Sequence, residues 1–340
     1  MRSGVRVLLL VAVASCVRPV ASFVCGSSDQ CTGGGVCQPV GFCSFSDTTC
    51  ATGQRYGTAS GALAGVCVGA ETDAPPGCDL AKPFGSPALV DGVGSAAEDG
   101  SLRLSPDEKA GYFFSARTGT KLLYTASRTS AIAAFSGVTV LANVNTGDQY
   151  NPAITADGSN LFFASLRTSG IGDNDIYQAT RSGTSDFTNI RLAPTVNTIL
   201  SEVQPYVTHD GGTMYFVRKL LPGITGSTVF RATGSVTAGF SNANPVAELD
   251  GPTNDTDPVL SADGLTLYWG TDRAGGQGDI DVWQAQRETI TAAFHGLAPV
   301  ASVNTASFDS PSDISEDGCR LYLTSLRSGK PAIYVATRPP

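Results

Sequence analysis

Apolar and polar positions repeat along most of the chain with a period slightly above fifty residues. Each copy contains a Phe, a short apolar strand, a turn centred on Asp, an aromatic-rich strand and a further strand. The marker phenylalanines are Phe84, Phe135, Phe187, Phe240 and Phe294. Self-similarity at a fixed period predicts a repeat fold in which each copy forms one structural unit. Here the unit is expected to hold four strands joined by three turns.

The turns between the first two long strands of each copy explain how the strands pair. They are centred on Asp107, Asp157, Asp210, Asp263 and Asp317. In four copies Gly follows the Asp and accepts the positive φ of a tight hairpin, whereas the first copy has Glu108. The strand after the turn is apolar at consecutive positions, as in residues 161–163. Such a strand is buried on both faces, which favours the blade of a β-propeller.

The order of strands predicts how the ring closes. The repeats begin with an outer strand, Ser86 to Val90, and stop after a third strand, Ala332 to Thr337. We therefore expect the first strand to complete the last sheet. The predicted fold class is all-β, a five-bladed β-propeller of four-stranded antiparallel blades at residues 79–340.

Three segments carry a resemblance to a known repeat: Leu104-Ser105-Pro106-Asp107, Asp175-Ile176-Tyr177 and Asp281-Val282-Trp283. They resemble the TolB-like, WD-repeat-like propeller repeats, and the resemblance covers residues 84–340. It implies a propeller fold. TolB itself carries six such blades, whereas this chain shows five.

The N-terminus resembles an export signal. Two arginines precede an apolar run at residues 7–14, which is too short to span a bilayer. The run ends in a sequence similar to a bacterial lipobox with Cys16 as the lipidation candidate, while residues 20–22 offer an ordinary cleavage site. We expect residues 1–22 to be the signal and the protein to be secreted or to lie in the cell envelope, as an outer-membrane lipoprotein or in the periplasm.

Cysteines support an oxidising compartment. Besides Cys16 they are Cys25, Cys31, Cys37, Cys43, Cys50, Cys67, Cys78 and Cys319. No C-x-x-C pair occurs and the two histidines are remote, so disulfides are favoured over zinc. Residues 23–78 are expected to form a disulfide-rich segment and linker, similar to Cys-rich segments at the head of exported bacterial proteins.

Cys78 is predicted to pair with Cys319. The six cysteines from 25 to 67 can satisfy one another, and Cys78 precedes the closing strand of the sheet that Cys319 enters. The alternative is that Cys78 joins the other six and Cys319 stays a buried thiol. The connectivity among residues 25–67 is open.

Charge excludes one class of partner. The net charge is −8 and the basic residues are scattered, which argues against nucleic acid. No other run of about 18 apolar residues indicates a membrane span. We expect a monomer without a cofactor or a metal.

Carboxylates recur near the start of the innermost strand of each copy: Asp99, Asp148, Glu202, Asp255, Asp257 and Asp309. On one reading they surround the channel mouth and bind a cation, a cationic peptide end or a sugar. On the other, each pairs with the Arg that stands ten residues after the turn Asp in four copies. Repetition in every copy favours pairing, because a repeated charge usually serves the repeat itself.

The third copy departs from this pattern. It has Leu220 in place of the Arg, an apolar loop containing Leu221 and Ile224, and Glu202 with only Arg218 near it in sequence. This loop is a candidate binding edge. The alternative is decay of the repeat.

No motif for a nucleophile or a catalytic metal occurs. The leading hypothesis is an exported, non-enzymatic propeller that binds a protein, peptide or envelope glycan through its channel-face loops. The alternative is a glycan-active hydrolase or lyase, because five-bladed propellers host enzymes that use paired carboxylates. Two unpaired carboxylates at the mouth would favour the enzyme.

Overall fold

The chain divides into two compact units, residues 1–74 and residues 75–340. The computed structural model describes Cys25 and residues 27–38, 42–50, 53–57, 68, 77–183, 186–193, 195–219 and 226–340. Within these ranges no helix has the length and apolar character needed to cross a membrane.

The small unit is held by disulfides. A single 3₁₀ turn, η1 (Ser28–Gln30), precedes the three-stranded antiparallel sheet. Its strands are β1 (Val36–Cys37), β2 (Cys43–Ser46) and β3 (Gln54–Tyr56). Disulfides join Cys25 to Cys37 and Cys31 to Cys43, and Cys50 is also disulfide-bonded. Since few apolar side chains are buried here, the cross-links supply the stability that a core this small lacks. Cys16 and Cys67 lie outside the described residues.

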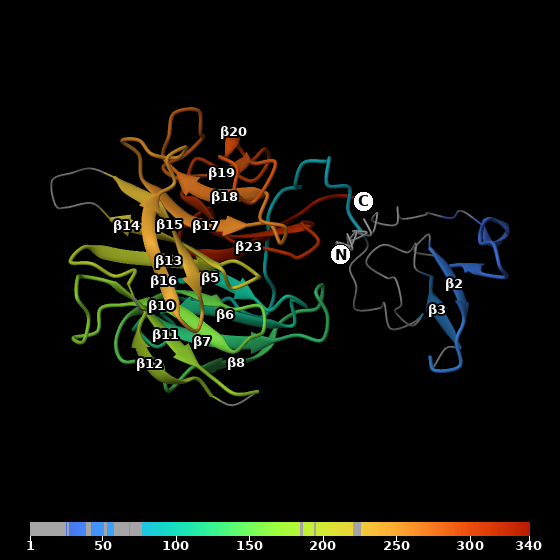
Figure 1. The fold of residues 1–340 in the computed structure, drawn as a ribbon, viewed down its shortest axis with the longest axis horizontal. Helices are drawn as coiled ribbons and strands as arrows, with labels where there is room; N and C mark the ends of the chain where they lie inside the picture. The colour runs from blue at the N-terminus through green and yellow to red at the C-terminus, as the bar shows by residue number, and fades with distance from the viewer. Residues whose placement is uncertain are drawn as a thin grey trace, which may run out of the picture. The chain divides into compact units, whose positions relative to one another are not determined.

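The larger unit consists of four-stranded antiparallel sheets, five in the described part of the chain (Figure 1). Their orders are β5-β6-β7-β8, β9-β10-β11-β12, β13-β14-β15-β16, β17-β18-β19-β20 and β21-β22-β23-β4. The strands are β4 (Ala88–Leu89), β5 (Asp99–Leu104), β6 (Ala110–Ser115), β7 (Leu122–Ser127), β8 (Ser136–Val140), β9 (Gln149–Ile154), β10 (Asn160–Ser165), β11 (Asp175–Thr180), β12 (Thr188–Leu192), β13 (Ser201–Val207), β14 (Thr213–Lys219), β15 (Ser227–Ser235), β16 (Gly239–Pro245), β17 (Asp255–Leu260), β18 (Thr266–Thr271), β19 (Asp281–Gln286), β20 (His295–Pro299), β21 (Asp309–Ile314), β22 (Arg320–Ser325) and β23 (Ala332–Thr337).

The first strand of each sheet packs against the first strands of two other sheets. The contacts run β5 to β9, β9 to β13, β13 to β17, β17 to β21 and β21 back to β5. These strands therefore surround one axis, which is the arrangement of a β-propeller. The second strands are buried between neighbouring sheets, with Trp269 of β18 fully inaccessible.

Ring closure joins the first and last parts of this unit. β4 pairs with β23, and a disulfide connects Cys78 to Cys319. Glu108 adopts the positive φ that Gly takes in the other hairpins. Its buried carboxylate accepts hydrogen bonds from Arg128 of the first sheet and from Arg320 and the Tyr322 hydroxyl of the last. The side chain that departs from the repeat thus links the two ends of the ring.

Three copies of the repeat contain a Val-Asn-Thr tripeptide, at residues 144–146, 196–198 and 303–305, and its Asn has a structural role. The Asn197 amide accepts from the backbone N–H of Ile176 at 2.8 Å and donates to its carbonyl at 2.9 Å. Asn145 makes the same two bonds to Leu123, and Asn304 makes them to Val282. Each Asn therefore supplies an acceptor for a backbone N–H of the third strand and a second donor to its carbonyl, which also accepts from the backbone N–H of Leu141, Ala193 or Val300.

Arginines at the ends of third strands bridge neighbouring sheets through tyrosine hydroxyls. The pairs are Arg128 with Tyr322, Arg181 with Tyr112, Arg287 with Tyr215 and Arg338 with Tyr268. At the boundary between the sheets of β9–β12 and β13–β16, Gly234 stands in place of the Arg and Phe162 in place of the Tyr. Phe162 packs there against Phe240, with ring centroids 6.0 Å apart.

Candidate functional site

The predicted carboxylates at the start of the inner strands are mostly paired. Four buried ion pairs join Asp99 to Arg117 at 3.2 Å, Glu202 to Arg218 at 2.7 Å, Asp255 to Arg273 at 3.2 Å and Asp309 to Arg327 at 2.7 Å. All four carboxylates have at most 1% of their side chains exposed. Each arginine also donates to a backbone carbonyl of the preceding turn, such as Arg327 to Val303 at 2.7 Å. These charges stabilise the repeat and are not free for a ligand.

Glu202 pairs with Arg218 on β14, the arginine near it in sequence, which replaces the one that the loop lacks. The placement of Asp148 is corrected. Asp148 is exposed and accepts a hydrogen bond from the Lys121 backbone N–H, so it does not occupy the repeated position. That position belongs to Gln149, whose Oε1 accepts from Arg167 at 3.2 Å. Leu221 and Ile224 lie outside the described residues.

Asp257 occupies a different place, in a group of polar residues around the axis. This axial cluster consists of Ser101, Asn151, Gln204, Asp257 and Ser310, one from each inner strand. The last four each directly precede a proline, a sequence signal that could have identified the group. The first four have φ between 46° and 55° and lie where the strand pairing shifts in register. Such bulges re-aim side chains, here toward the axis.

Hydrogen bonds connect the axial cluster across four sheets. Asn151 Nδ2 donates to Ser101 Oγ at 3.0 Å and to Asp257 Oδ1 at 3.4 Å, while Ser310 Oγ donates to Asp257 Oδ2 at 2.8 Å. Asp257 is only 7% exposed, and burial raises the pKa of its carboxyl from the usual 3.8 to about 6, against the opposing effects of Ser310 and Arg103. It forms no ion pair with the described residues.

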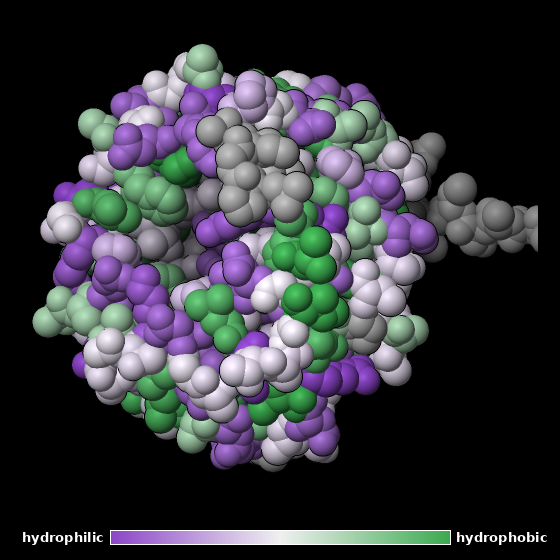
Figure 2. Space-filling model, turned by 90° about the vertical axis from the view of Figure 1, so that its left-hand side faces the viewer, coloured by the Kyte–Doolittle hydropathy of each residue, from purple (hydrophilic) through white to green (hydrophobic). Residues whose placement is uncertain are grey.

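A pocket of about 450 Å³ opens over this cluster. Ser101, Asn151, Gln204 and Asp257 lie in its floor, and its wall includes Phe114, Tyr150, Phe308, Lys121, Glu98 and Asp279. Lys121 pairs with Glu98 at 2.8 Å. Gln204 Oε1 is buried without a hydrogen-bond partner in the described part of the chain. The corresponding face of the larger unit shows a central hollow bordered by hydrophilic residues (Figure 2).

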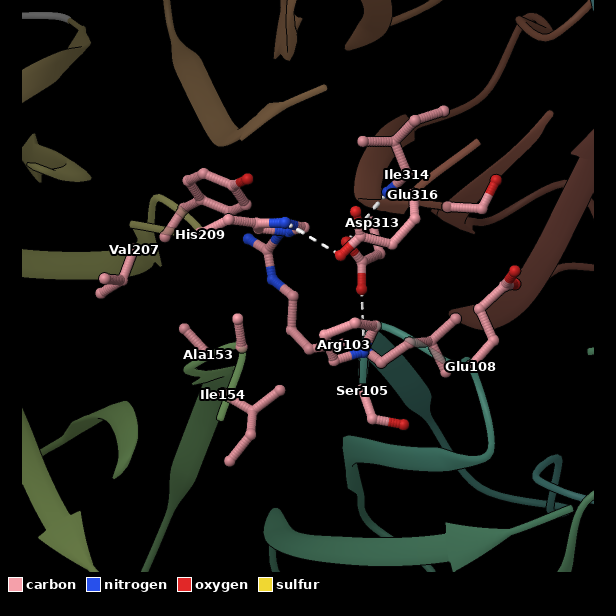
Figure 3. Close-up of a pocket in the computed structure, with 15 residues that line it drawn as sticks. Arg103, Ser105, Glu108, Ala153, Ile154, Val207, His209, Asp313, Ile314 and Glu316 are labelled. Atoms are coloured by element: carbon pink, nitrogen blue, oxygen red, sulfur yellow. Dashed lines mark hydrogen bonds and ion pairs between the residues drawn. The ribbon is translucent and has the colours of Figure 1, made fainter. Parts of the chain in front are cut away.

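The opposite end of the axis is nearly filled (Figure 3). Its cavity of about 30 Å³ has room for only one or two water molecules. The Arg103 guanidinium lies 5.4 Å from the Tyr206 ring centroid, and Asp313 accepts from the Leu104 N–H at 2.6 Å. His209 Nδ1 lies 2.9 Å from Glu316 Oε1 beside this cavity. Of the two ends of the axis in the described part of the chain, the wider pocket is therefore the one with room for a ligand larger than water.

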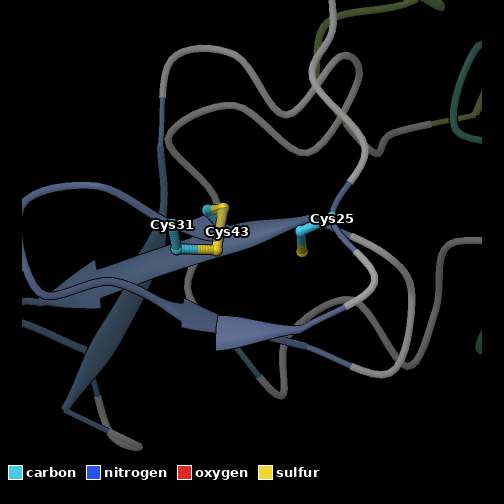
Figure 4. Close-up of side chains that lie close together, drawn as sticks. All are labelled: Cys25, Cys31 and Cys43. Atoms are coloured by element: carbon cyan, nitrogen blue, oxygen red, sulfur yellow. A yellow bond between two sulfur atoms is a disulfide. The ribbon is translucent and has the colours of Figure 1, made fainter. Parts of the chain in front are cut away.

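Among the described residues, one group of side chains has the spacing of metal ligands. The sulfurs of Cys25, Cys31 and Cys43 lie within 4.8 Å of one another (Figure 4). All three belong to disulfides, which leave no thiolate to coordinate zinc.

Comparison with known proteins adds a likeness of fold. No protein-family profile and no curated protein matches the chain. An α-L-arabinofuranosidase from Podospora anserina, solved with cellotriose, is 13% identical with a TM-score of 0.52 over 76% of this chain and 98% of its own. A GH62 hydrolase solved with xylotriose is 10% identical with a TM-score of 0.50 over 75% and 97%.

TolB from Acinetobacter baumannii is also similar in structure, at 16% identity and a TM-score of 0.43. The match covers 72% of this chain and 56% of TolB. The two hydrolase structures, with TM-scores of 0.50 and 0.52, are similar in fold, and at these identities the likeness says nothing of activity.

Proposed function

We propose that the protein is an exported five-bladed β-propeller that binds a protein or peptide partner at the wide mouth of its axis and performs no catalysis. The observation that carries this proposal is the contrast between two sets of polar groups. The repeated carboxylates form ion pairs with arginines. In the axial cluster, by contrast, Asp257 has no ion pair and the Gln204 amide oxygen has no hydrogen-bond partner among the described residues, and both line an open pocket.

The five-blade reading is supported by the cyclic contacts of the five inner strands and by the pairing of β4 with β23. Asp257 and Asp279 both lie in the described lining of this pocket without an ion pair, but Asp279 is exposed at the rim. We favour binding because a glycosidase needs an acid and a base or nucleophile on either side of one bond, and of these two carboxylates Asp257 alone is buried.

Site-specific photo-cross-linking tests the binding function. A photoreactive residue replaces Asp279, which is exposed at the rim of the pocket, and Thr139 on the outer strand β8 serves as the control. We expect one discrete adduct with an envelope component at position 279 and none at position 139. Equal adducts at both positions, or none at either, contradict a partner at the mouth.

A glycan-active enzyme is the second candidate, favoured by one observation. The pKa of Asp257, raised by burial to about 6, suits a general acid, and Glu98 and Asp279 stand in the same pocket. Hydrolysis of aryl glycosides or of arabinoxylan oligosaccharides that disappears in Asp257→Asn would establish it and overturn the non-catalytic proposal. No turnover with these substrates supports the binding function.

Export is proposed on the basis of the N-terminal sequence and the disulfides. If Cys16 is lipidated, Cys16→Ser moves the protein from the membrane fraction to the soluble fraction. Identical detergent partitioning of both forms argues for simple secretion.

A further inference from the structure

Asp257 and Gln204, in the described lining of the wide pocket, both have hydrogen-bond acceptor capacity that the described residues leave unused. Gln204 Oε1 has no donor among the described residues, and the Asp257 carboxylate receives hydrogen bonds only from Asn151 and Ser310. A carboxylate can accept about four hydrogen bonds, so its capacity is not exhausted. The Asn151 amide N–H₂ is already engaged by Ser101 and Asp257. The floor of the pocket therefore suits a ligand that donates hydrogen bonds.

The charge of the pocket points the same way. Its described lining holds three carboxylates, Glu98, Asp257 and Asp279, and one cation, Lys121. Lys121 is engaged by Glu98, so Asp257 and Asp279 have no cationic partner in the pocket. Arg103 influences Asp257 but lines the closed end of the axis. A buried carboxylate without an ion pair is costly, and a cation from a ligand would offset that cost.

Aromatic rings line the entrance above the carboxylate. Phe114, Tyr150 and Phe308 all border the pocket. Lys121 Nζ already lies 5.7 Å from the Phe114 ring centroid, which shows that the wall accommodates an alkylammonium group beside an aromatic face. The rings also suit the methylene stem of a long aliphatic amine.

We infer that the wide pocket recognises a primary ammonium group of the partner, which donates hydrogen bonds to Asp257 and Gln204 while its alkyl stem packs on the aromatic wall. This inference rests on the proposed binding function and names its ligand chemistry. The ammonium ion has three donors and no acceptor, which matches the floor. A neutral sugar also donates hydrogen bonds, but it brings no positive charge to offset the negative charge of Asp257.

Isothermal titration calorimetry on the mature chain tests the inference with four probes. N-acetyl-lysine amide carries a side-chain ammonium, and glycyl-alanine amide carries an amino-terminal one. N-acetyl-norleucine amide has the alkyl stem without the charge, and xylotriose represents a neutral sugar. We expect at least one ammonium probe to bind at least about tenfold more tightly than norleucine amide and xylotriose. The stronger of the first two identifies the source of the ammonium group.

Three variants make the measurement specific. Asp257→Asn keeps the shape of the side chain and is expected to weaken the ammonium probe at least about tenfold. Asp250→Asn makes the same charge change at an exposed position of the loop before β17, outside the pocket, and is expected to change affinity less than about twofold. Gln204→Lys places an ammonium group in the pocket and should abolish probe binding. Thermal unfolding establishes that each variant is folded.

Several outcomes overturn the inference: equal binding of norleucine amide, equal loss in the Asp257 and Asp250 variants, or no ammonium binding at all. If no ammonium probe binds while the adduct at position 279 forms, the binding function stands and the ligand chemistry is wrong. If xylotriose alone binds and Asp257→Asn abolishes it, the pocket is a sugar site.

Discussion

The Arg181 guanidinium donates a 2.8 Å hydrogen bond to the hydroxyl of Tyr112 in the preceding sheet. The guanidinium carbon of Arg181 also lies 4.5 Å from the Phe187 ring centroid, so the side chain is held between a hydroxyl and an aromatic face. Because three further sheet boundaries repeat this contact, it is the general means by which neighbouring sheets are joined.

Removing one such hydroxyl measures what the contact contributes. Tyr112→Phe leaves packing intact and is expected to lower the free energy of unfolding by about 1–2 kcal/mol, since the hydrogen bond involves a charged donor. Phe162→Tyr makes the reverse change at the boundary where Gly234 provides no arginine. It is also expected to destabilise, by about 1–3 kcal/mol, because it buries a hydroxyl without that partner. Urea unfolding of both variants checks the pair, and stabilisation by Phe162→Tyr would contradict this account.

The stability of the ring should depend on the disulfide between Cys78 and Cys319. The bond closes a loop of 241 residues, and the chain-entropy relation gives a contribution of about 5 kcal/mol, an upper value for that mechanism. The double replacement of both cysteines by serine is expected to lower the free energy of unfolding of the larger unit accordingly. Replacing Cys25 and Cys37 by serine is the matched control and should leave that transition unchanged. Equal losses of unfolding free energy in the two double variants would contradict the prediction.

Asp257 should make the larger unit less stable at neutral than at acidic pH. Its folded pKa of about 6 exceeds the usual 3.8, so the folded state holds the proton more tightly than the unfolded chain. The penalty is absent below about pH 4, grows between about pH 4 and 6 and is complete above that range, at roughly 3 kcal/mol.

Asp257→Asn is therefore expected to stabilise the protein by up to about 3 kcal/mol at pH 8 and to have little effect at pH 4. Urea titrations at both pH values measure this difference, with Asp250→Asn as the control. A variant that is less stable than the parent at pH 8 disproves the assignment of the penalty to this carboxyl.

The pair of Glu202 and Arg218 offers a graded test of the repeated ion pairs. Glu202→Gln converts it to the neutral-acceptor pair that Gln149 and Arg167 already form, so we expect a loss of only about 1–2 kcal/mol. Glu202→Ala leaves Arg218, whose side chain is 13% exposed, without its counter-charge and should cost about 3–5 kcal/mol. Equal losses in urea unfolding would show that the acceptor at this position is irrelevant.

The repeat was readable from the sequence because Asp-Gly turns and the arginines at fixed spacing impose local geometry. The pairing of Asp99 with Arg117 and the joining of Cys78 to Cys319 followed from the same logic of strand order. The sequence places Asp148 wrongly at the repeated position, because its carboxylate resembles those of the other copies more than the neutral side chain of Gln149, which occupies the position. The axial cluster is not predicted as a group because its members share no residue type. The proline that follows four of them is its sequence signal, and the bulges, with positive φ in Ser101, Asn151, Gln204 and Asp257, turn the side chains inward.

The disulfide between Cys78 and Cys319 also changes how the protein can come apart. Every sheet of the ring lies on chain between these two residues or on the short segments that pair next to them. A protease that cuts one exposed turn in this stretch opens the polypeptide but releases no fragment, because both pieces stay tethered at the sulfurs. A once-nicked ring therefore stays a single covalent molecule for as long as this disulfide is oxidised.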